Sequence, residues 1–359
     1  MTRRSPLEVP ESKPVNIKVL AEYLSLSPTT ISLVMNDAPA GRSIPEPTRE
    51  RVREAAKKLG YRPSFFARSL RKKQSFTIGT MVPEISDPYS TMIMSGVDDV
   101  IQEEGYLDFT VSHRRKPDLI EEYPRILLDR SVEGIIVVDT HLLHTLQVPT
   151  VSIGGHQTLD GITNVVLDHR RAAELVLRYL HKLGHRDFAY IRGQEHSSDS
   201  KVRWENLMDV SRELGLRHVP ELTLQLEIDS PSPELSYPLV GQMLATRLPF
   251  TALVCYNDFA AIGAIRALVD AGLRVPEDIS VVGFDDVQNA AFNNPSLTTV
   301  RQPLREMGRL AAKALLRRIR EPRLPVVDIP VLPELLIRES TLQPSQERLG
   351  ATGFSLSTR

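Results

Sequence analysis

Short hydroxyl and amide side chains are concentrated in residues 27–36, which read SPTTISLVMN. Such groups donate hydrogen bonds to DNA phosphates and so position a protein on a duplex. Three of them are candidate phosphate donors: Thr30, Ser32 and Asn36. If the segment is the second helix of a helix-turn-helix, its N-terminal residues face base edges in the major groove. Three residues then meet the bases: Pro28, Thr29 and Leu33.

The surrounding residues supply the helices that this motif needs. Apolar residues at helical spacing predict a helix from Val15 to Leu24, which the turn Ser25-Leu26-Ser27 ends. Ser27 is the expected N-cap of the second helix, and Pro28 takes its first position, where a missing N–H does no harm. A third helix is predicted from Glu46 to Leu59.

The chain of 359 residues is nearly neutral, but its charge is unevenly distributed. Residues 1–73 contain 15 Lys and Arg against 7 Asp and Glu, a net charge of +8, whereas the remainder carries −9. A basic head on a larger acidic body indicates a nucleic-acid-binding module joined to a domain of another kind.

From Ser75 onwards, apolar strand-like runs alternate with longer helical patterns. The predicted strands are Thr77–Val82, Gly134–Val138, Thr150–Ile153, Phe188–Ile191, Leu253–Tyr256 and Ile279–Phe284. The predicted helices are Pro88–Glu104, Leu119–Arg130, His169–Leu183, Lys201–Leu214, Glu234–Ala245, Phe259–Ala271 and Leu304–Ile319. This alternation indicates α/β lobes with parallel sheets and helices on both faces.

Other classes of protein are not supported. No apolar run is long enough to span a membrane, and the polar N-terminus lacks a secretory signal, so we expect a cytoplasmic protein. The single cysteine, Cys255, excludes an internal disulfide. No hydrolase, P-loop or dinucleotide-binding motif occurs, and the scattered histidines lack metal-ligand spacing. We therefore expect no enzyme, no metal site and no cofactor.

Several blocks occur in an order that resembles the lactose-repressor (LacI/GalR) family of bacterial transcription factors. They include VNIKVLAEYLSLSPTTISLVMN, TRERVREAAKKLGYRPSFFARSLR, LHKLGHRDFAYIRG and YNDFAAIGAIRALVDAGLRVPEDISVVGFDD. The resemblance covers roughly Val15 to Ser340. It implies a homodimer, with a tetramer as the alternative, whose heads bind a near-palindromic operator. It also implies a two-lobed body, similar to periplasmic sugar-binding proteins, that senses a small molecule.

The predicted organisation has five parts. They are a flexible leader (1–14), a helix-turn-helix domain (15–62), a hinge helix and linker (63–74), a two-lobed effector-binding and dimerisation domain (75–340) and a disordered tail (341–359).

The resemblance extends the predicted DNA contacts. Ser27 joins the three phosphate donors at positions that match the family's. Leu33 departs from the pattern, because the family usually has arginine there and an Arg–guanine pair is the commonest specific contact. The segment Arg68-Ser69-Leu70-Arg71 resembles the family's hinge helix. In such a hinge a leucine, here Leu70, wedges into the minor groove while basic residues such as Arg68 hold phosphates.

The ligand of the body is expected between the lobes, at the carboxyl ends of strands. Sugars need carboxylates to accept hydrogen bonds from hydroxyls, and Arg or Asn to donate them. Four residues match the family's pocket positions: Asp168, Arg203, Asn257 and Asp285. Tyr89 and Ser90 can add a stacking face and a hydroxyl. Individually, Asp168 and Asn257 can instead be helix caps, and Arg203 a surface ion pair.

The sequence thus predicts a DNA-binding repressor controlled by a sugar or sugar derivative. The alternative effectors are a nucleobase and a phosphorylated metabolite, and a solute-binding receptor is the alternative class of protein. Four basic residues near strand ends would favour an acidic effector, although we expect them to be solvated loop charges: His113, Arg114, Arg115 and His156. Whether the effector releases DNA or is required for DNA binding stays open.

Overall fold

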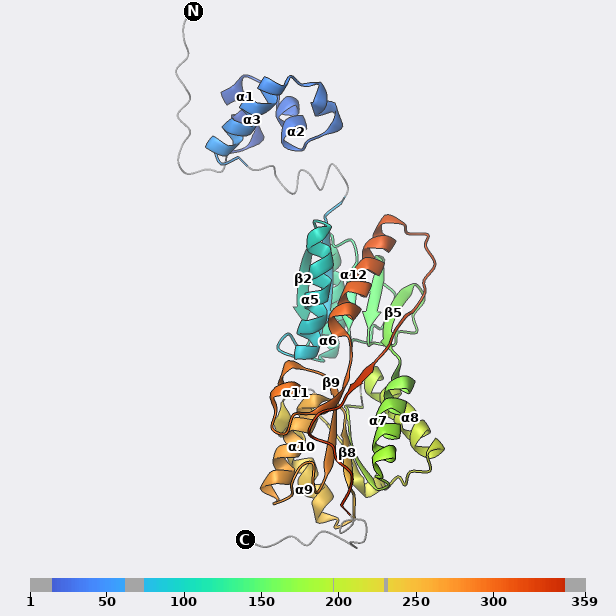
Figure 1. The fold of residues 1–359 in the computed structure, drawn as a ribbon. Coiled ribbons are helices and arrows are strands. Elements are labelled where there is room, and N and C mark those ends of the chain that lie inside the picture. Colours follow the sequence, from blue (N-terminus) through green and yellow to red (C-terminus); the bar gives the residue numbers. More distant parts are fainter. Residues whose placement is uncertain (1–14, 62–73, 196, 229–231, 346–359) are drawn as a thin grey trace, which may run out of the picture. The chain divides into compact units, whose positions relative to one another are not determined.

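The computed structural model describes residues 15–61, 74–195, 197–228 and 232–345 (Figure 1). The chain divides into two compact units, Met1–Ser75 and Phe76–Arg359, which we describe separately. The expected leader, the hinge residues Arg68 and Leu70, and the tail beyond residue 345 lie outside the described residues.

The first unit contains the predicted helix-turn-helix. Its helices are α1 (Ile17–Leu24), α2 (Pro28–Met35), the 3-10 helix η1 (Pro39–Ser43) and α3 (Glu46–Lys58). Ser27 caps α2 as expected, because its hydroxyl accepts a hydrogen bond from the backbone N–H of Thr30 at 3.0 Å. Apolar side chains from all three α-helices, among them Leu20, Ile31 and Val52, are fully buried and form the core.

Two backbone features shape the surroundings of α2: a left-handed residue before the helix and a close contact after it. The turn before it requires a left-handed residue, and Ser25 takes this place with φ 56° and ψ 39°. Glycine would adopt this conformation without the steric cost of a Cβ. Gly41 in η1 is needed for space, since a Cβ there would lie 2.8 Å from the carbonyl oxygen of Leu33. The loop after α2 therefore packs directly on the helix backbone.

The second unit consists of two lobes, each built on a six-stranded sheet. The strand order is β11-β5-β4-β3-β1-β2 in the first lobe and β12-β10-β9-β8-β6-β7 in the second. Among the described strands, all neighbours are parallel except β10 and β12, which are antiparallel. The prediction of parallel sheets is confirmed, with one antiparallel edge strand as the exception.

The first lobe takes its last helix and its edge strand from late in the chain. Its strands are β1 (Thr77–Val82), β2 (Leu107–Ser112), β3 (Ile135–Val138), β4 (Thr150–Ile153), β5 (Ile162–Leu167) and β11 (Ile329–Val331). Its helices are α5 (Pro88–Glu103), α6 (Pro117–Asp129) and α12 (Leu304–Arg320). Buried apolar residues join α5 and α12 to one face of the sheet and α6 to the other.

The second lobe is more continuous in sequence. Its strands are β6 (Phe188–Arg192), β7 (Thr223–Gln225), β8 (Ala252–Cys255), β9 (Ser280–Asp285), β10 (Thr298–Arg301) and β12 (Glu334–Leu336). Its α-helices are α7 (His169–Leu183), α8 (Ser198–Glu213), α9 (Tyr237–Ala245), α10 (Asp258–Asp270) and α11 (Gln288–Phe292). The 3-10 helices η2 (Pro220–Leu222) and η3 (Pro233–Leu235) complete it. Helices α9 and α10 pack on one face of the sheet, and α7 and α8 on the other.

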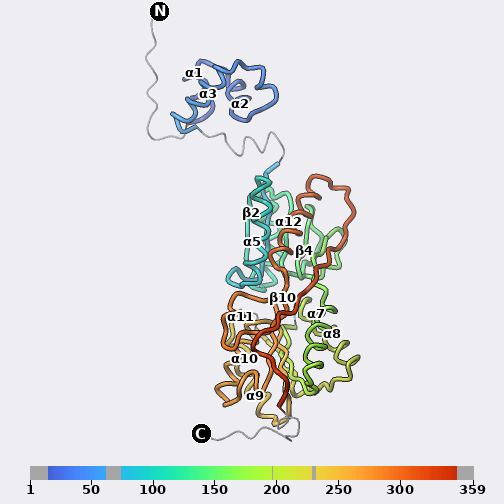
Figure 2. The backbone as a smooth tube through the Cα atoms, viewed as in Figure 1, coloured from blue at the N-terminus to red at the C-terminus, as the bar shows by residue number. Residues whose placement is uncertain are grey.

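The chain passes between the lobes three times (Figure 2). The crossings fall between β5 and α7, between β10 and α12, and between β11 and β12. Three parallel connections restrict the lobes to hinge-like movement about one region. In the first lobe, α5 and α12 pack backbone to backbone, because Cβ atoms at Gly96 and Gly308 would lie about 2 Å from carbonyl oxygens of the opposite helix.

The predicted strands and helices occur within a few residues of their expected places, but several strands were not predicted. Five of the missed strands are β2, β7, β10, β11 and β12, which lie at or next to a sheet edge or are three to four residues long. Their mixed polarity hides the pattern on which the prediction depends: β2, for example, has no fully buried residue. The sixth missed strand is β5, whose sequence ITNVVL has the polar residues Thr163 and Asn164 within its apolar run. The predicted start of α8 at Lys201 is three residues late, since the helix begins at Ser198.

A buried histidine joins the end of α7 to the second sheet. The helix ends at Gly184, whose φ is 107°, and His185 then turns inward. Its Nδ1 lies 2.8 Å from the Thr251 hydroxyl and its Nε2 lies 2.9 Å from the carbonyl oxygen of Leu342. Burial lowers the pKa of His185 to about 4, although the Leu342 carbonyl opposes this shift. The folded chain therefore holds the neutral ring.

We expect the second unit to lose stability as the pH falls from about 6.5 towards 4. The unfolded chain takes up a proton at His185 near its ordinary pKa, whereas the folded chain does so only near 4, so the neutral ring favours folding above pH 6.5. The loss reaches at most about 3 kcal/mol. Urea unfolding between pH 4.5 and 7.5 measures it. His185→Gln should flatten the pH dependence, whereas His218→Gln, at an exposed histidine, should preserve it; equal slopes in all three proteins would contradict the assignment.

Candidate functional site

Loops at the carboxyl ends of strands in the two lobes contact each other directly. In the first lobe Asp139 follows β3 and Gly155 follows β4, and in the second lobe Ser197 and Ser198 lie at the start of α8. The Ser197 hydroxyl donates to the Asp139 carboxylate at 3.3 Å, and the Ser198 hydroxyl donates to the Gly155 carbonyl oxygen at 2.9 Å. The lobes therefore meet at the edge of the sheets where ligands of open α/β folds bind.

Arg203 on α8 is at the centre of this junction and is 5% exposed. Its guanidinium donates to the Asp199 carboxylate and to the Tyr256 carbonyl oxygen, both at 2.5 Å. The same group lies 3.6 Å from the ring centroid of Phe284 and 4.5 Å from that of Tyr256. The expected pocket arginine is thus held rigidly by a buried ion pair, so the alternative of a surface ion pair is wrong.

Asp199 connects this arginine to two histidines. One carboxylate oxygen faces Arg203, and the other lies 2.9 Å from Nε2 of His169 and 3.4 Å from Nε2 of His156. Burial alone would raise the pKa of Asp199, but His169 and Arg203 outweigh it and hold the pKa well below its usual range. The carboxylate is therefore ionised although it is buried.

Asp285, at the end of β9, has a different environment. Its carboxylate accepts a hydrogen bond from the Gln302 amide at 2.6 Å, and its φ of 108° places the side chain in an uncommon backbone conformation. Burial raises its pKa well above the usual value, against the opposing charge of Arg203. Asp285 therefore binds a proton more readily than Asp199, although both carboxyl groups lie at the same junction.

The two residues predicted after the first strand are buried in the same region. The Tyr89 hydroxyl lies against Gly154, where a Cβ would come within 2.6 Å of it. Burial raises the pKa of Tyr89, and the carboxylates of Asp199 and Asp139 add to the shift. Ser90 is fully buried, and its hydroxyl has no hydrogen-bond partner among the described residues.

The remaining two predicted pocket residues act as helix caps. The Asp168 carboxylate accepts from the backbone N–H of Arg171 at 2.8 Å and caps α7, and Asn257 accepts from Ala260 at 2.9 Å and caps α10. Both side chains are half-buried. The capping interpretation is confirmed for both, and a contact with a ligand stays a prediction.

The expectation of four solvated basic residues is wrong for three of them. His113 is fully buried, with Nε2 at 2.7 Å from the Thr140 hydroxyl, and Arg115 forms a partly buried ion pair with Asp139. His156 faces Asp199. Only Arg114 among the four is exposed, at 70% of its side-chain area. Loops at strand ends turn back into the lobe junction, so their charged residues meet carboxylates instead of water.

Sequence reasoning missed two partners of Arg203, Asp199 and Tyr256, and also His169, which contacts Asp199. Asp199, His169 and Tyr256 were not among the predicted site residues, although each lies beside one: Asp199 precedes Arg203 by one helical turn. The spacing of an aspartate four residues before an arginine was a usable signal. The contact between His156 and Asp199 could not be predicted from local spacing, since 43 residues separate them.

On the first unit, the predicted DNA contacts extend along α2 from its N-cap, Ser27, to its C-cap, Asn36. Ser27, Pro28, Thr29 and Asn36 are exposed, and Thr30, Ser32 and Leu33 are half-buried. The Ser27 hydroxyl is engaged with Thr30 at 2.9 Å, and the Asn36 amide donates to the Ser32 carbonyl oxygen at 2.8 Å. Local hydrogen bonds therefore hold the Ser27 and Asn36 side chains in place.

Comparisons with known proteins agree with both units. Residues 16–64 match the lacI family of bacterial regulatory proteins, and residues 177–341 match the periplasmic binding protein-like domain. The HTH-type transcriptional repressor PurR of Haemophilus influenzae is 32% identical over 336 residues, which cover 90% of this chain and 98% of that protein.

Two solved structures extend the likeness. The lac repressor dimer bound to operator and the anti-inducer ONPF has a TM-score of 0.82 at 25% identity, covering 92% of this chain and 100% of the other. A LacI family transcriptional regulator from Enterococcus faecium with bound ribose has a TM-score of 0.66 at 25% identity, covering 75% of this chain and 100% of the other.

A helix-turn-helix head and a two-lobed body with a polar junction define a DNA-binding transcriptional regulator. More particularly, the chain belongs to the lacI family of bacterial regulatory proteins. No described helix has the length and apolar character needed to cross a bilayer.

Proposed function

We propose that this protein is a dimeric, non-enzymatic repressor whose affinity for operator DNA changes when a neutral, polyhydroxylated molecule binds between the lobes. The observation that carries the proposal is a set of buried polar atoms without partners at the lobe junction. Nε of Arg203 and the hydroxyl of Ser90 are buried and have no hydrogen-bond partner among the described residues. Such atoms cost about 1–3 kcal/mol each unless something satisfies them, so a polar ligand is the natural partner.

The charges at the junction favour a neutral effector. Asp139 is paired with Arg115 and Asp199 with Arg203, and burial raises the pKa of Asp285 and so favours its neutral form. Both guanidinium groups are thus already paired and offer no unpaired charge to a phosphate, while sugar hydroxyls donate to carboxylates and accept from arginine. The related regulator that holds ribose agrees with this choice, and a nucleobase is the second candidate.

We expect one neutral pentose or hexose to raise the melting temperature of the protein. Binding raises the free energy of unfolding by RT ln(1 + [L]/Kd), or about 2.7 kcal/mol at 100 times Kd. Asp285→Asn should reduce the shift, because the amide has one acceptor oxygen, whereas the carboxyl group has a second oxygen besides the one that accepts from Gln302. Asp209→Asn, at an exposed ion pair on α8, is the matched control and should respond normally. A larger shift with sugar phosphates than with the parent sugars would contradict the proposal.

The helix-turn-helix and the hinge supply the DNA contacts that we propose. We assign phosphate contacts to Ser27, Thr30, Ser32, Asn36 and the hinge residue Arg68. We assign base contacts to Pro28, Thr29 and Leu33, and the minor-groove contact to Leu70. Leu33 offers only apolar contact, such as with a thymine methyl group, so the operator should differ from those read by an arginine at this position.

We expect Leu70→Ala to weaken operator binding strongly while leaving random-duplex binding nearly unchanged. A leucine wedge costs unstacking energy that only a specific, bent complex recovers, whereas non-specific binding depends on basic residues. Fluorescence anisotropy with both duplexes at several salt concentrations measures this, and affinity should fall steeply with salt in each case. Arg68→Ala is the control and should weaken binding to both duplexes. If Leu70→Ala weakened binding to both duplexes equally, Leu70 would not act as a wedge.

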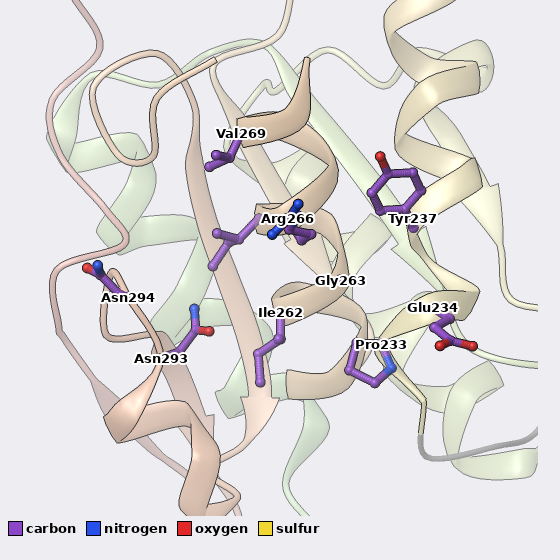
Figure 3. Close-up of a pocket in the computed structure, with 10 residues that line it drawn as sticks. Pro233, Glu234, Tyr237, Ile262, Gly263, Arg266, Val269, Asn293 and Asn294 are labelled. Carbon is purple, nitrogen blue, oxygen red and sulfur yellow. The ribbon is translucent and has the colours of Figure 1, made fainter. Parts of the chain in front are cut away.

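An open groove on the second lobe is the proposed contact between two copies. It has a volume of about 610 Å³ and lies between α9, α10 and the loop after α11 (Figure 3). Tyr237, Ile262 and Val269 line it, and Phe292, beside the lining residue Asn293, is 83% exposed. Exposed apolar surface of this kind marks an interaction site, and the structurally similar lac repressor is a dimer. A dimer places two heads on the two halves of an operator.

We expect Val269→Asp to shift the protein from dimer to monomer and to weaken operator binding by at least tenfold, because a carboxylate would be buried without a partner in the contact. Sedimentation velocity and operator titration test this. Val327→Asp is the control: Val327 is also exposed, at 63%, but lies away from the groove in the loop before β11. A Val269→Asp protein that stays dimeric would place the contact elsewhere.

A further inference from the structure

A second cluster at the lobe junction shares Asp199 with the proposed effector site. It consists of His156, His169 and Asp199, whose ligand atoms all lie within 4.8 Å of one another. His169 and Asp199 are almost fully buried, and the His156 side chain is 19% exposed. Sequence spacing predicted no metal ligands, because the three residues are brought together from the loop after β4 and the starts of α7 and α8.

Two of the distances within the cluster are close to those between ligands of one ion. Both histidines direct Nε2 at the same oxygen of Asp199, at 2.9 and 3.4 Å. Ligand atoms that each lie about 2.1 Å from one metal ion, at tetrahedral or octahedral angles, are about 3.0–3.4 Å apart. The longer of the two contacts exceeds the usual range of an N–H···O hydrogen bond, about 2.7–3.2 Å. The three polar atoms thus lie close enough to share one ion, although the 2.9 Å contact also has the length of a hydrogen bond.

The surroundings orient the three ligands. Arg203 binds the second oxygen of Asp199 and so fixes the carboxylate, which is the usual role of an outer partner at metal sites. The ring of His169 stacks near Phe284, with centroids 6.5 Å apart. Ser198 holds the carbonyl oxygen of Gly155, directly before His156.

We propose that His156, His169 and Asp199 bind one divalent transition-metal ion of the Zn²⁺ type, which joins the two lobes. Two imidazoles and one carboxylate are the donor set that such ions prefer, and three protein ligands leave further positions for water. His156 comes from the first lobe and the other two ligands from the second, so the ion resists their separation. The proposal depends on this cluster alone and not on the identity of the effector.

The test is metal binding by the full chain after removal of metals with a chelator, without DNA or sugar. Calorimetric titration with ZnCl₂ should show one ion per chain, and Co²⁺ should give the visible absorption of a low-coordinate site. His156→Asn and His169→Asn should each weaken Zn²⁺ binding by about tenfold or more. His218→Asn, at an exposed histidine of the same lobe, is the matched control and should bind as the unchanged protein does.

Hydrogen exchange separates coordination between the lobes from adventitious binding. Zn²⁺ should slow amide exchange in residues 154–157 and 197–203 of the unchanged protein and not of His156→Asn. Absence of stoichiometric binding, or affinity that neither substitution reduces, would overturn the proposal. If His169→Asn fails to fold, the half-exposed His156→Asn decides. Loss of metal binding with an unaltered sugar response would leave the effector proposal standing, so the two can fail separately.

Discussion

The ion pair of Arg203 and Asp199 is the interaction on which the lobe junction depends. Both residues lie on the first turns of α8, and both are removed from water. Desolvation of two charges is expensive, and a buried pair is tolerated when further hydrogen bonds complete it. Here Arg203 also binds the Tyr256 carbonyl oxygen, and Asp199 also meets two histidines. One helix start therefore links the sheet of its own lobe to a loop of the other.

Some polar residues at the strand ends cap helices, and others have side chains that can still bind a ligand. Asp168 and Asn257 use their side-chain oxygens to cap helices, as their positions before α7 and α10 require. Asp285 ends a strand instead, and its one described hydrogen bond comes from the side chain of Gln302. A carboxyl group that caps nothing and is still buried is free to exchange partners when a ligand enters.

Local patterns made the head and the central strands predictable. Ser27 and Pro28 mark the start of α2 because capping and proline geometry act within a few residues, and buried runs such as IIVV in β3 need no partner to be recognised. The junction was harder. Helix α8 begins three residues before its predicted start, and Asp199 lies within those three residues. Contacts such as that of His156 with Asp199 arise only from the topology of two sheets.

The late origin of α12 and β11 has a consequence for how the chain folds during synthesis. The head needs nothing beyond α3 to bury its core, so it can fold while the ribosome is still translating the first lobe. The first lobe cannot cover α5 until α12, which begins at Leu304, has been made, and the second lobe lies between the two. For most of translation, apolar surface of the first lobe therefore stays exposed, which is the condition under which nascent chains need chaperones. A nascent chain would hold a finished DNA-binding module long before the body that regulates it exists.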